Sequence, residues 1–186
     1  TAIVAVYAVG SQIYSNYMAV GLSVSNVFLP RVSQIYNRDK NAEGLSDIFA
    51  KVGRISFLIT SLVLCGFILF GQEFISLWAG NDFSEAYYVA LIVMIPFTVD
   101  IIQNIGLTIL QVINKYSFRG IMYLSIAIIN IIATFFMAKY WGMIGAATAT
   151  AISMIVGNCI IMNVYYKKVA KLNVGKFWLE ILKMLP

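Results

Sequence analysis

Two uncharged stretches, separated only by Lys139 and Tyr140, decide the fold of this chain. They are residues 120–138, GIMYLSIAIINIIATFFMA, and residues 141–166, WGMIGAATATAISMIVGNCIIMNVYY. At about 1.5 Å per residue, each stretch is long enough as a helix to cross most or all of a hydrocarbon layer roughly 30 Å thick. Neither stretch alternates apolar and polar residues, as a transmembrane strand would. Because a helix satisfies its own backbone groups in lipid, we expect two consecutive membrane-spanning helices.

The same pattern extends toward the N-terminus. Residues 2–29 and 55–71 carry no charge, and residues 86–114 carry only Asp100. The whole chain is 61% hydrophobic and 11% charged, whereas soluble domains are about 25% charged. The sequence therefore predicts an all-α integral membrane protein with five transmembrane helices.

The basic residues predict the orientation of these helices. Lys and Arg are concentrated in residues 31–54 and 167–183, and two more lie between residues 115 and 119, whereas residues 72–85 have none. Because Lys and Arg favour the cytoplasmic side, we expect a multi-pass protein of the cytoplasmic membrane that starts outside and ends inside. Topology accounts for the net charge of +5, so no nucleic-acid partner is expected. The odd number of spans predicts a piece of a longer protein.

Two cytoplasmic segments have apolar residues at helical spacing. In the first loop these are Leu45, Ile48, Phe49 and Val52, which predict a short helix lying on the membrane. In the tail, residues 174–186, they are Val174, Phe177, Ile181 and Leu185. Arg54, at the start of the second span, is expected to extend toward lipid headgroups.

Polar residues follow one face of the first and third spans at the same offsets of 0, 3, 4, 11 and 14. On the first span they are Gln12, Ser15, Asn16, Ser23 and Asn26, and on the third they are Asp100, Gln103, Asn104, Gln111 and Asn114. Single amides of this kind often only hold helices together. Two matching stripes instead predict the walls of a polar cavity, because unpaired polar groups in hydrocarbon cost several kcal/mol each.

Asp100 is the most informative single residue, since an ionisable group near the middle of a span costs roughly 2.5–3.5 kcal/mol to insert. It marks either a substrate or ion pathway or a protonated carboxyl that bonds to a neighbouring amide. On the fifth span, Gly145, Ala149, Ser153 and Gly157 form a small-residue face that predicts close helix packing.

Nothing in the sequence predicts an enzyme. The chain has no histidine, its two cysteines lie in apolar runs, and it has no cluster of acids or bases that suits a metal or phosphate site. We expect no catalytic residue, no cofactor and no metal.

The chain resembles the polysaccharide export flippases of the multidrug, oligosaccharidyl-lipid and polysaccharide exporter superfamily. The resemblance rests on LPRVS at residues 29–33, FG at 70–71, LWAG at 77–80, GMIGAA at 142–147 and NVYYK at 163–167. It implies two helical bundles around a central cavity, with this chain forming most of the second bundle. It also implies transport of an undecaprenyl-diphosphate-linked oligosaccharide for the biosynthesis of capsule, O-antigen or exopolysaccharide.

On this interpretation the substrate cavity is lined by Gln12, Asn16, Ser23, Asn26, Asp100, Gln103, Asn104, Gln111 and Asn114, with Arg31 at its cytoplasmic mouth. The partners would be the lipid-linked oligosaccharide, membrane lipids and the first bundle, and a coupling ion, a proton or sodium, remains open. One alternative is a drug or cation antiporter that uses Asp100. Another is a non-transporting scaffold subunit that binds partners through the small-residue face.

Overall fold

The computed structural model describes residues 2–39 and 42–184, and within these ranges every regular element is a helix. In chain order the elements are α1 (Ala2–Val27), α2 (Leu29–Asp39), α3 (Ala42–Trp78), the 3₁₀-helix η1 (Asn81–Phe83), α4 (Ala86–Val112), α5 (Ser117–Met154), the π-helix η2 (Ile155–Ile161), α6 (Met162–Lys168) and α7 (Val174–Leu182). The prediction of an all-helical chain is confirmed.

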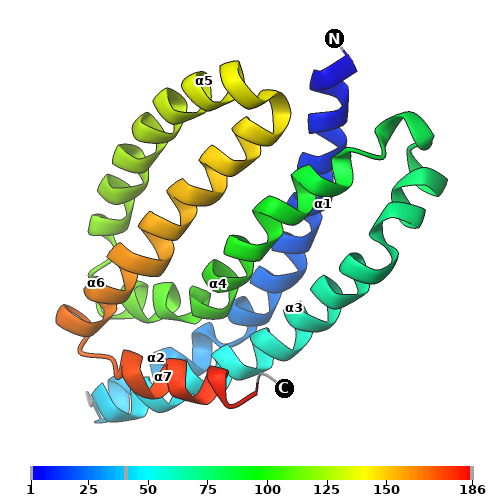
Figure 1. The fold of residues 1–186 in the computed structure, drawn as a ribbon. Coiled ribbons are helices and arrows are strands. Elements are labelled where there is room, and N and C mark those ends of the chain that lie inside the picture. Colours follow the sequence, from blue (N-terminus) through cyan, green and yellow to red (C-terminus); the bar gives the residue numbers. More distant parts are fainter. Residues whose placement is uncertain (1, 40–41, 185–186) are drawn as a thin grey trace.

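Three described helices are long and apolar enough to cross a membrane: Glu43–Trp78, Ala86–Val112 and Ser117–Lys168. The last of these is two helices, because the backbone leaves helical geometry at Trp141 and Gly142. Gly142 has φ 57° and ψ −137°, a backbone conformation that residues with a Cβ atom rarely adopt. The chain reverses there, and α5 forms the antiparallel hairpin at the upper left of Figure 1. The helix α1 is not among the three, since its polar residues lower its hydropathy.

The α3 helix corrects one prediction from the sequence. We predicted a short helix around Leu45–Val52 that lies on the membrane and is separate from the span at residues 55–71. Instead one continuous helix runs from Ala42 to Trp78, and Leu45, Phe49 and Val52 are buried in the protein core. The sequence has no proline between these segments that would end the helix, and α7 covers the apolar face that the sequence assigns to lipid.

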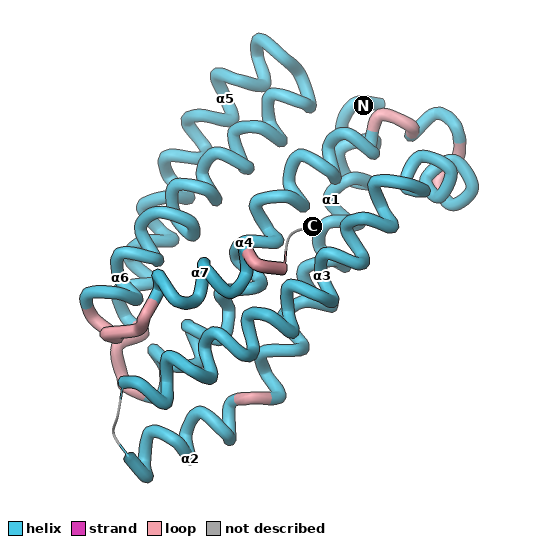
Figure 2. The backbone as a smooth tube through the Cα atoms, turned by 60° about the horizontal axis from the view of Figure 1, so that its bottom comes forward, coloured by secondary structure: helices cyan, strands magenta, loops and turns pink. Residues whose placement is uncertain are grey.

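The α4 helix is the centre of the fold. It lies between α1, α3 and α5 and packs against all three (Figure 2). Every residue from Asp100 to Leu110 is buried. A polar contact joins three of the helices, because the Tyr17 hydroxyl lies 2.7 Å from Thr98 Oγ1 and donates to the Thr60 carbonyl at 3.3 Å. The hairpin formed by α5 and the helices that follow it packs on the opposite flank of α4, where Ala147 contacts Val89 and Val93. This arrangement places polar residues of α4 between α1 and α5.

The small-residue face of the fifth predicted span is used inside the chain. Gly145, Ala149, Ser153 and Gly157 are all buried. Gly157 packs against Ile126 of the first half of the hairpin, so its lack of a side chain brings the two halves together. The prediction of close helix packing at this face is confirmed.

The tail forms the α7 helix, which lies across the lower part of α3 in Figure 1. The Asn173 side chain caps its first turn by accepting a hydrogen bond from the Lys176 amide at 2.9 Å. Phe177 and Ile181 are buried, and the Phe177 ring stacks on Phe49 of α3 with centroids 4.3 Å apart. The apolar face predicted for the tail therefore packs on α3, while Leu185 lies outside the described residues.

Candidate functional site

A polar cavity of about 410 Å³ lies between α1, α4 and the start of α5. Its lining residues are Met18, Leu22, Asn26, Asn104, Tyr116, Arg119, Gly120 and Tyr123. The methionine and leucine form an apolar side, whereas the two asparagines, the arginine and the tyrosines present hydrogen-bonding groups. The cavity therefore combines one permanent positive charge with several neutral donors and acceptors.

Arg119 is held in place by Tyr123, one helical turn further along α5. Arg119 Nη2 donates to the Tyr123 hydroxyl at 2.8 Å, and its guanidinium carbon lies 4.6 Å from the centroid of the same ring. The Tyr123 hydroxyl then donates to Asn158 Oδ1 at 3.1 Å. These contacts fix the direction of the guanidinium while part of it still lines the cavity.

Asn158 belongs to the π-helix η2 and is 4% exposed. A π-helix has wider turns than an α-helix and is often found where a helix departs from regular geometry for a functional reason. Here the distorted segment carries the side chain that accepts the Tyr123 hydrogen bond. The network thus joins both arms of the α5 hairpin.

Asp100 lies on the same face of α4 as Asn104, one turn away, and is 7% exposed. Its carboxyl group interacts electrostatically with Arg119 and Tyr123. It forms no hydrogen bond with any other residue that the structure describes. Asp100 therefore contributes a buried carboxyl group that interacts with the arginine of the cavity without lining the cavity itself.

Gln103 is a second unusual polar group on α4. It is 2% exposed, and neither its amide nitrogen nor its amide oxygen has a hydrogen-bond partner within the described ranges. A buried amide without partners costs about 1–3 kcal/mol. The α4 helix thus carries two buried polar side chains, Asp100 and Gln103, that have no hydrogen-bond partner among the described residues.

The structure brings together only some of the residues predicted to line a cavity. Asn26 and Asn104 line the same cavity, and Asp100 lies beside it. Gln12 and Asn16 bond to each other at 3.4 Å on the exposed face of α1, and Asn16 also borders a hollow of about 380 Å³ between α1 and α3.

The remaining predicted residues lie apart from this cavity. Ser23 is exposed and donates to the Val20 carbonyl of its own helix at 2.6 Å. Arg31 is exposed on α2, and Gln111 and Asn114 are exposed at the end of α4. The first stripe is thus an exposed polar face whose Asn26 borders the cavity, whereas the second is buried at Asp100, Gln103 and Asn104 and exposed at its end.

Three residues of the site were missed by sequence reasoning: Arg119, Tyr123 and Asn158. From the sequence, Arg119 is only a loop charge that sets the orientation, because the apolar run predicts that the fourth span begins at Gly120. The structure begins α5 at Ser117, which places Arg119 inside the helix. The spacing of four between Arg119 and Tyr123 was a usable signal, whereas the contact with Asn158 depends on tertiary structure.

No protein-family model, curated protein or solved structure matches the chain.

The chemistry available at this cavity is binding by charge and hydrogen bonds. Arginine and asparagine side chains suit phosphate oxygens and sugar hydroxyls. Among the described residues there is no group of three or more His, Cys, Asp or Glu side chains that could hold a metal ion.

Proposed function

We propose that this chain forms most of one bundle of a membrane flippase that moves an undecaprenyl-diphosphate-linked oligosaccharide across the cytoplasmic membrane. The transported molecule would serve the biosynthesis of capsule, O-antigen or exopolysaccharide. The proposal joins the family resemblance of the sequence with the chemistry of the cavity between α1, α4 and α5.

The observation that carries the proposal is a fixed arginine in an amide-rich cavity between apolar helices. Arg119 offers a charge and several N–H donors, which suit a diphosphate, while Asn26 and Asn104 offer groups that suit sugar hydroxyls. A substrate with both an anionic linkage and a carbohydrate needs this combination. The apolar Met18 and Leu22 on the same cavity suit the adjoining lipid.

The arrangement of the helices supports the same proposal. Five long helical segments (α1, α3, α4 and the two arms of the hairpin) run between two ends of the molecule (Figure 1). The exposed polar face of α1, with Gln12 and Asn16, would face the central cavity and the first bundle. Polar side chains on such a face would lose hydrogen-bond partners in contact with lipid, whereas water or protein can supply those partners.

The test is complementation of a strain that lacks its capsule or O-antigen flippase by the full-length protein. We expect the wild type to restore polysaccharide export and Arg119→Gln to reduce it about tenfold or more, since a charge-assisted hydrogen bond contributes about 1.5–3 kcal/mol. Lys139→Gln, which removes a charge at the opposite end of the hairpin, should leave export unchanged. Failure of the wild type to complement would count against the proposal.

Asp100 favours a second candidate, a drug or cation antiporter. A buried carboxyl without a hydrogen-bond partner among the described residues suits a cation or a proton-coupling site. This candidate expects drug resistance on expression of the full-length protein and loss of that resistance in Asp100→Asn. Polysaccharide export that depends on Arg119 would instead favour the flippase.

The scaffold alternative has less support, because the small-residue face that would bind a partner is already covered within the chain. It expects that replacing both polar stripes leaves function intact. The complementation assay decides this point with Asn26→Leu and Asn104→Leu, whose side chains line the cavity.

A further inference from the structure

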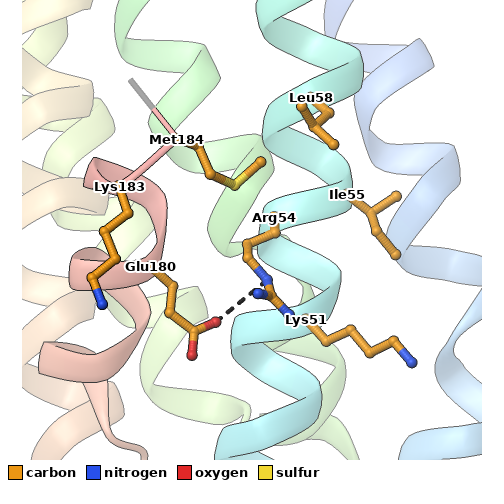
Figure 3. Close-up of a pocket in the computed structure, with 7 residues that line it drawn as sticks. All are labelled: Lys51, Arg54, Ile55, Leu58, Glu180, Lys183 and Met184. Atoms are coloured by element: carbon orange, nitrogen blue, oxygen red, sulfur yellow. Dashed lines mark ion pairs between the residues drawn. The ribbon is translucent and has the colours of Figure 1, made fainter. Parts of the chain in front are cut away.

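A second cavity, of about 600 Å³, lies between α3 and α7 (Figure 3). Its lining residues are Lys51, Arg54, Ile55, Leu58, Glu180, Lys183 and Met184. None of these lines the cavity of the proposed transport site. What this second cavity binds is therefore a separate question.

The charges of this cavity are predominantly positive. Lys51, Arg54 and Lys183 face a single acidic residue, Glu180. Arg54 Nε lies 3.3 Å from Glu180 Oε2, and Figure 3 shows the arginine reaching from α3 toward α7 to make this contact. Glu180 is the one described residue that pairs with Arg54, and the Arg54 side chain is 46% exposed, so one carboxylate does not occupy all of its N–H donors. The cavity thus holds an oriented guanidinium with free donors.

The other half of the lining is apolar. Ile55 and Leu58 follow Arg54 along α3, and Met184 extends from the end of α7. From Ile55 onward α3 carries no charged residue until Glu73, and Leu58 and Leu62 are exposed on it. The cavity therefore lies at the border between a charged and an uncharged stretch of a helix that is long enough to cross a membrane.

From this juxtaposition we propose that the groove between α3 and α7 is a binding site for an anionic phospholipid. The phosphate contacts the free N–H donors of Arg54, with Lys51 and Lys183 nearby, and an acyl chain lies along Ile55 and Leu58. A free anion would leave the apolar half of the groove unused, and a lipid without net charge would leave the excess positive charge uncompensated. The proposal requires α3 to lie in a membrane but does not depend on what is transported.

The first experiment measures lipid retained by the full-length protein after purification from nanodiscs of phosphatidylcholine and phosphatidylglycerol. Native mass spectrometry counts the phosphatidylglycerol molecules that remain bound. Lys51→Gln and Lys183→Gln, which break no ion pair among the described residues, are expected to weaken retention about fivefold each. Glu180→Gln is expected to strengthen it, because Arg54 then loses its competing carboxylate. Lys167→Gln, an exposed lysine outside the groove, should leave retention unchanged.

The second experiment separates a lipid from a free phosphate. Leu58→Gln should reduce phosphatidylglycerol retention, whereas Leu62→Gln, on the same helix but outside the groove, should not. Glycerol phosphate added to the protein in detergent should not displace the bound lipid. Displacement by glycerol phosphate would instead identify a site for a free anion. Equal losses in the groove variants and in Lys167→Gln would also overturn the proposal, as would retention that none of the groove variants changes.

Discussion

Tyr123 connects the charged residue of the cavity to the rest of the protein through one hydroxyl group. It accepts a hydrogen bond from Arg119 and donates one to Asn158. Both arms of the α5 hairpin therefore contribute to the position of the guanidinium. Because Asn158 is buried, the loss of this hydroxyl would leave its amide oxygen without that partner.

We predict that Tyr123→Phe keeps the ring but lowers stability by about 0.6 kcal/mol, and by no more than about 1.7 kcal/mol, the average and the maximum for hydrogen bonds between membrane helices. The thermal unfolding midpoint in detergent should fall by a few degrees, and polysaccharide export should fall with it. Tyr140→Phe is the matched control, since Tyr140 is 77% exposed and forms no hydrogen bond in the described part of the chain. Equal midpoints for the two variants would contradict a bridging role for Tyr123.

For individual residues, the sequence predicted the helix face on which polar side chains lie better than it predicted their hydrogen-bond partners. The spacing of Asp100 and Asn104 indicated one face of one helix, which the structure has. Arg119 was assigned to a loop because helix ends depend on local backbone geometry, which a charge count does not resolve. Asn158 was missed because its contact with Tyr123 joins residues that are distant in the sequence.

Among the elements, the contact between α3 and α7 has the clearest steric requirement. Gly53 faces the Phe177 ring, and a Cβ at this position would overlap that ring and lie 3.2 Å from the Ile102 carbonyl oxygen. The close approach of α7 therefore depends on the absence of a side chain at one residue of α3.

We predict that Gly53→Ala destabilises the protein by about 1–3 kcal/mol through overpacking. Gly66→Ala on the same helix is the control, because a Cβ there meets no atom within 4 Å. It should be neutral or stabilising by up to about 1 kcal/mol, since alanine is the better helix former. Thermal unfolding of both variants in one detergent makes the comparison, and a Gly53→Ala variant as stable as Gly66→Ala would refute the packing argument.

The α7 helix also makes a pH-sensitive contact. The Lys176 ammonium donates to Asp47 Oδ1 at 2.8 Å, and this hydrogen bond raises the pKa of Lys176 above its ordinary value of 10.5. Because the pKa is higher in the folded state, the contribution is complete below the ordinary value and is lost as pH rises through the raised one.

We therefore expect the Lys176–Asp47 pair to hold α7 equally well at all pH values around neutrality. The packing of α7 on α3 should weaken slightly only in strongly alkaline solution. The measurement is the fluorescence of Trp178 in a protein that carries Trp78→Phe and Trp141→Phe. Trp178 reports on the position of α7, because its indole donates a hydrogen bond to Asn163 Oδ1 on α6. Lys176→Gln should remove the alkaline step. The same step in that variant would assign it to another group.

For the whole molecule, the ends of the long helices fall into two groups. The connection with η1 and the reversal at Gly142 lie at one end, and α2 and α7 lie at the other (Figure 1). This separates the segment without basic residues, 72–85, from the basic segments 31–54 and 167–183. The grouping suits a protein that has its cytoplasmic surface at the end with α2 and α7.

We predict the corresponding labelling pattern in a full-length protein with Cys65 and Cys159 replaced by serine. A membrane-impermeant maleimide added to intact cells should label Asp82→Cys. Asn37→Cys, on α2, should react only after the cells are permeabilised. Both positions are exposed, so a difference in labelling reports the side of the membrane. Labelling of Asn37→Cys in intact cells would contradict the predicted orientation and indicate the opposite one.

The number of long helical segments was predictable from the apolar runs, but their ends were not. Continuous apolar sequence predicts where a helix lies, whereas α3 extends beyond its apolar run to Ala42, and this extension packs against α7, which lies far away in the sequence. Which polar face is buried was also undetermined, because the sequence does not specify that α5 covers the face of α4 that carries Asp100.

The reversal at Trp141 and Gly142 has a consequence for biogenesis. The two arms of the hairpin are joined with almost no connecting loop, and no charged residue lies between Tyr140 and Tyr166. On the prediction that both arms span a membrane, the second arm follows the first directly during synthesis, and we expect the two arms to enter the translocon as a pair. Gly142 would then act before the protein is complete, as the residue that lets the nascent chain turn back inside the insertion machinery.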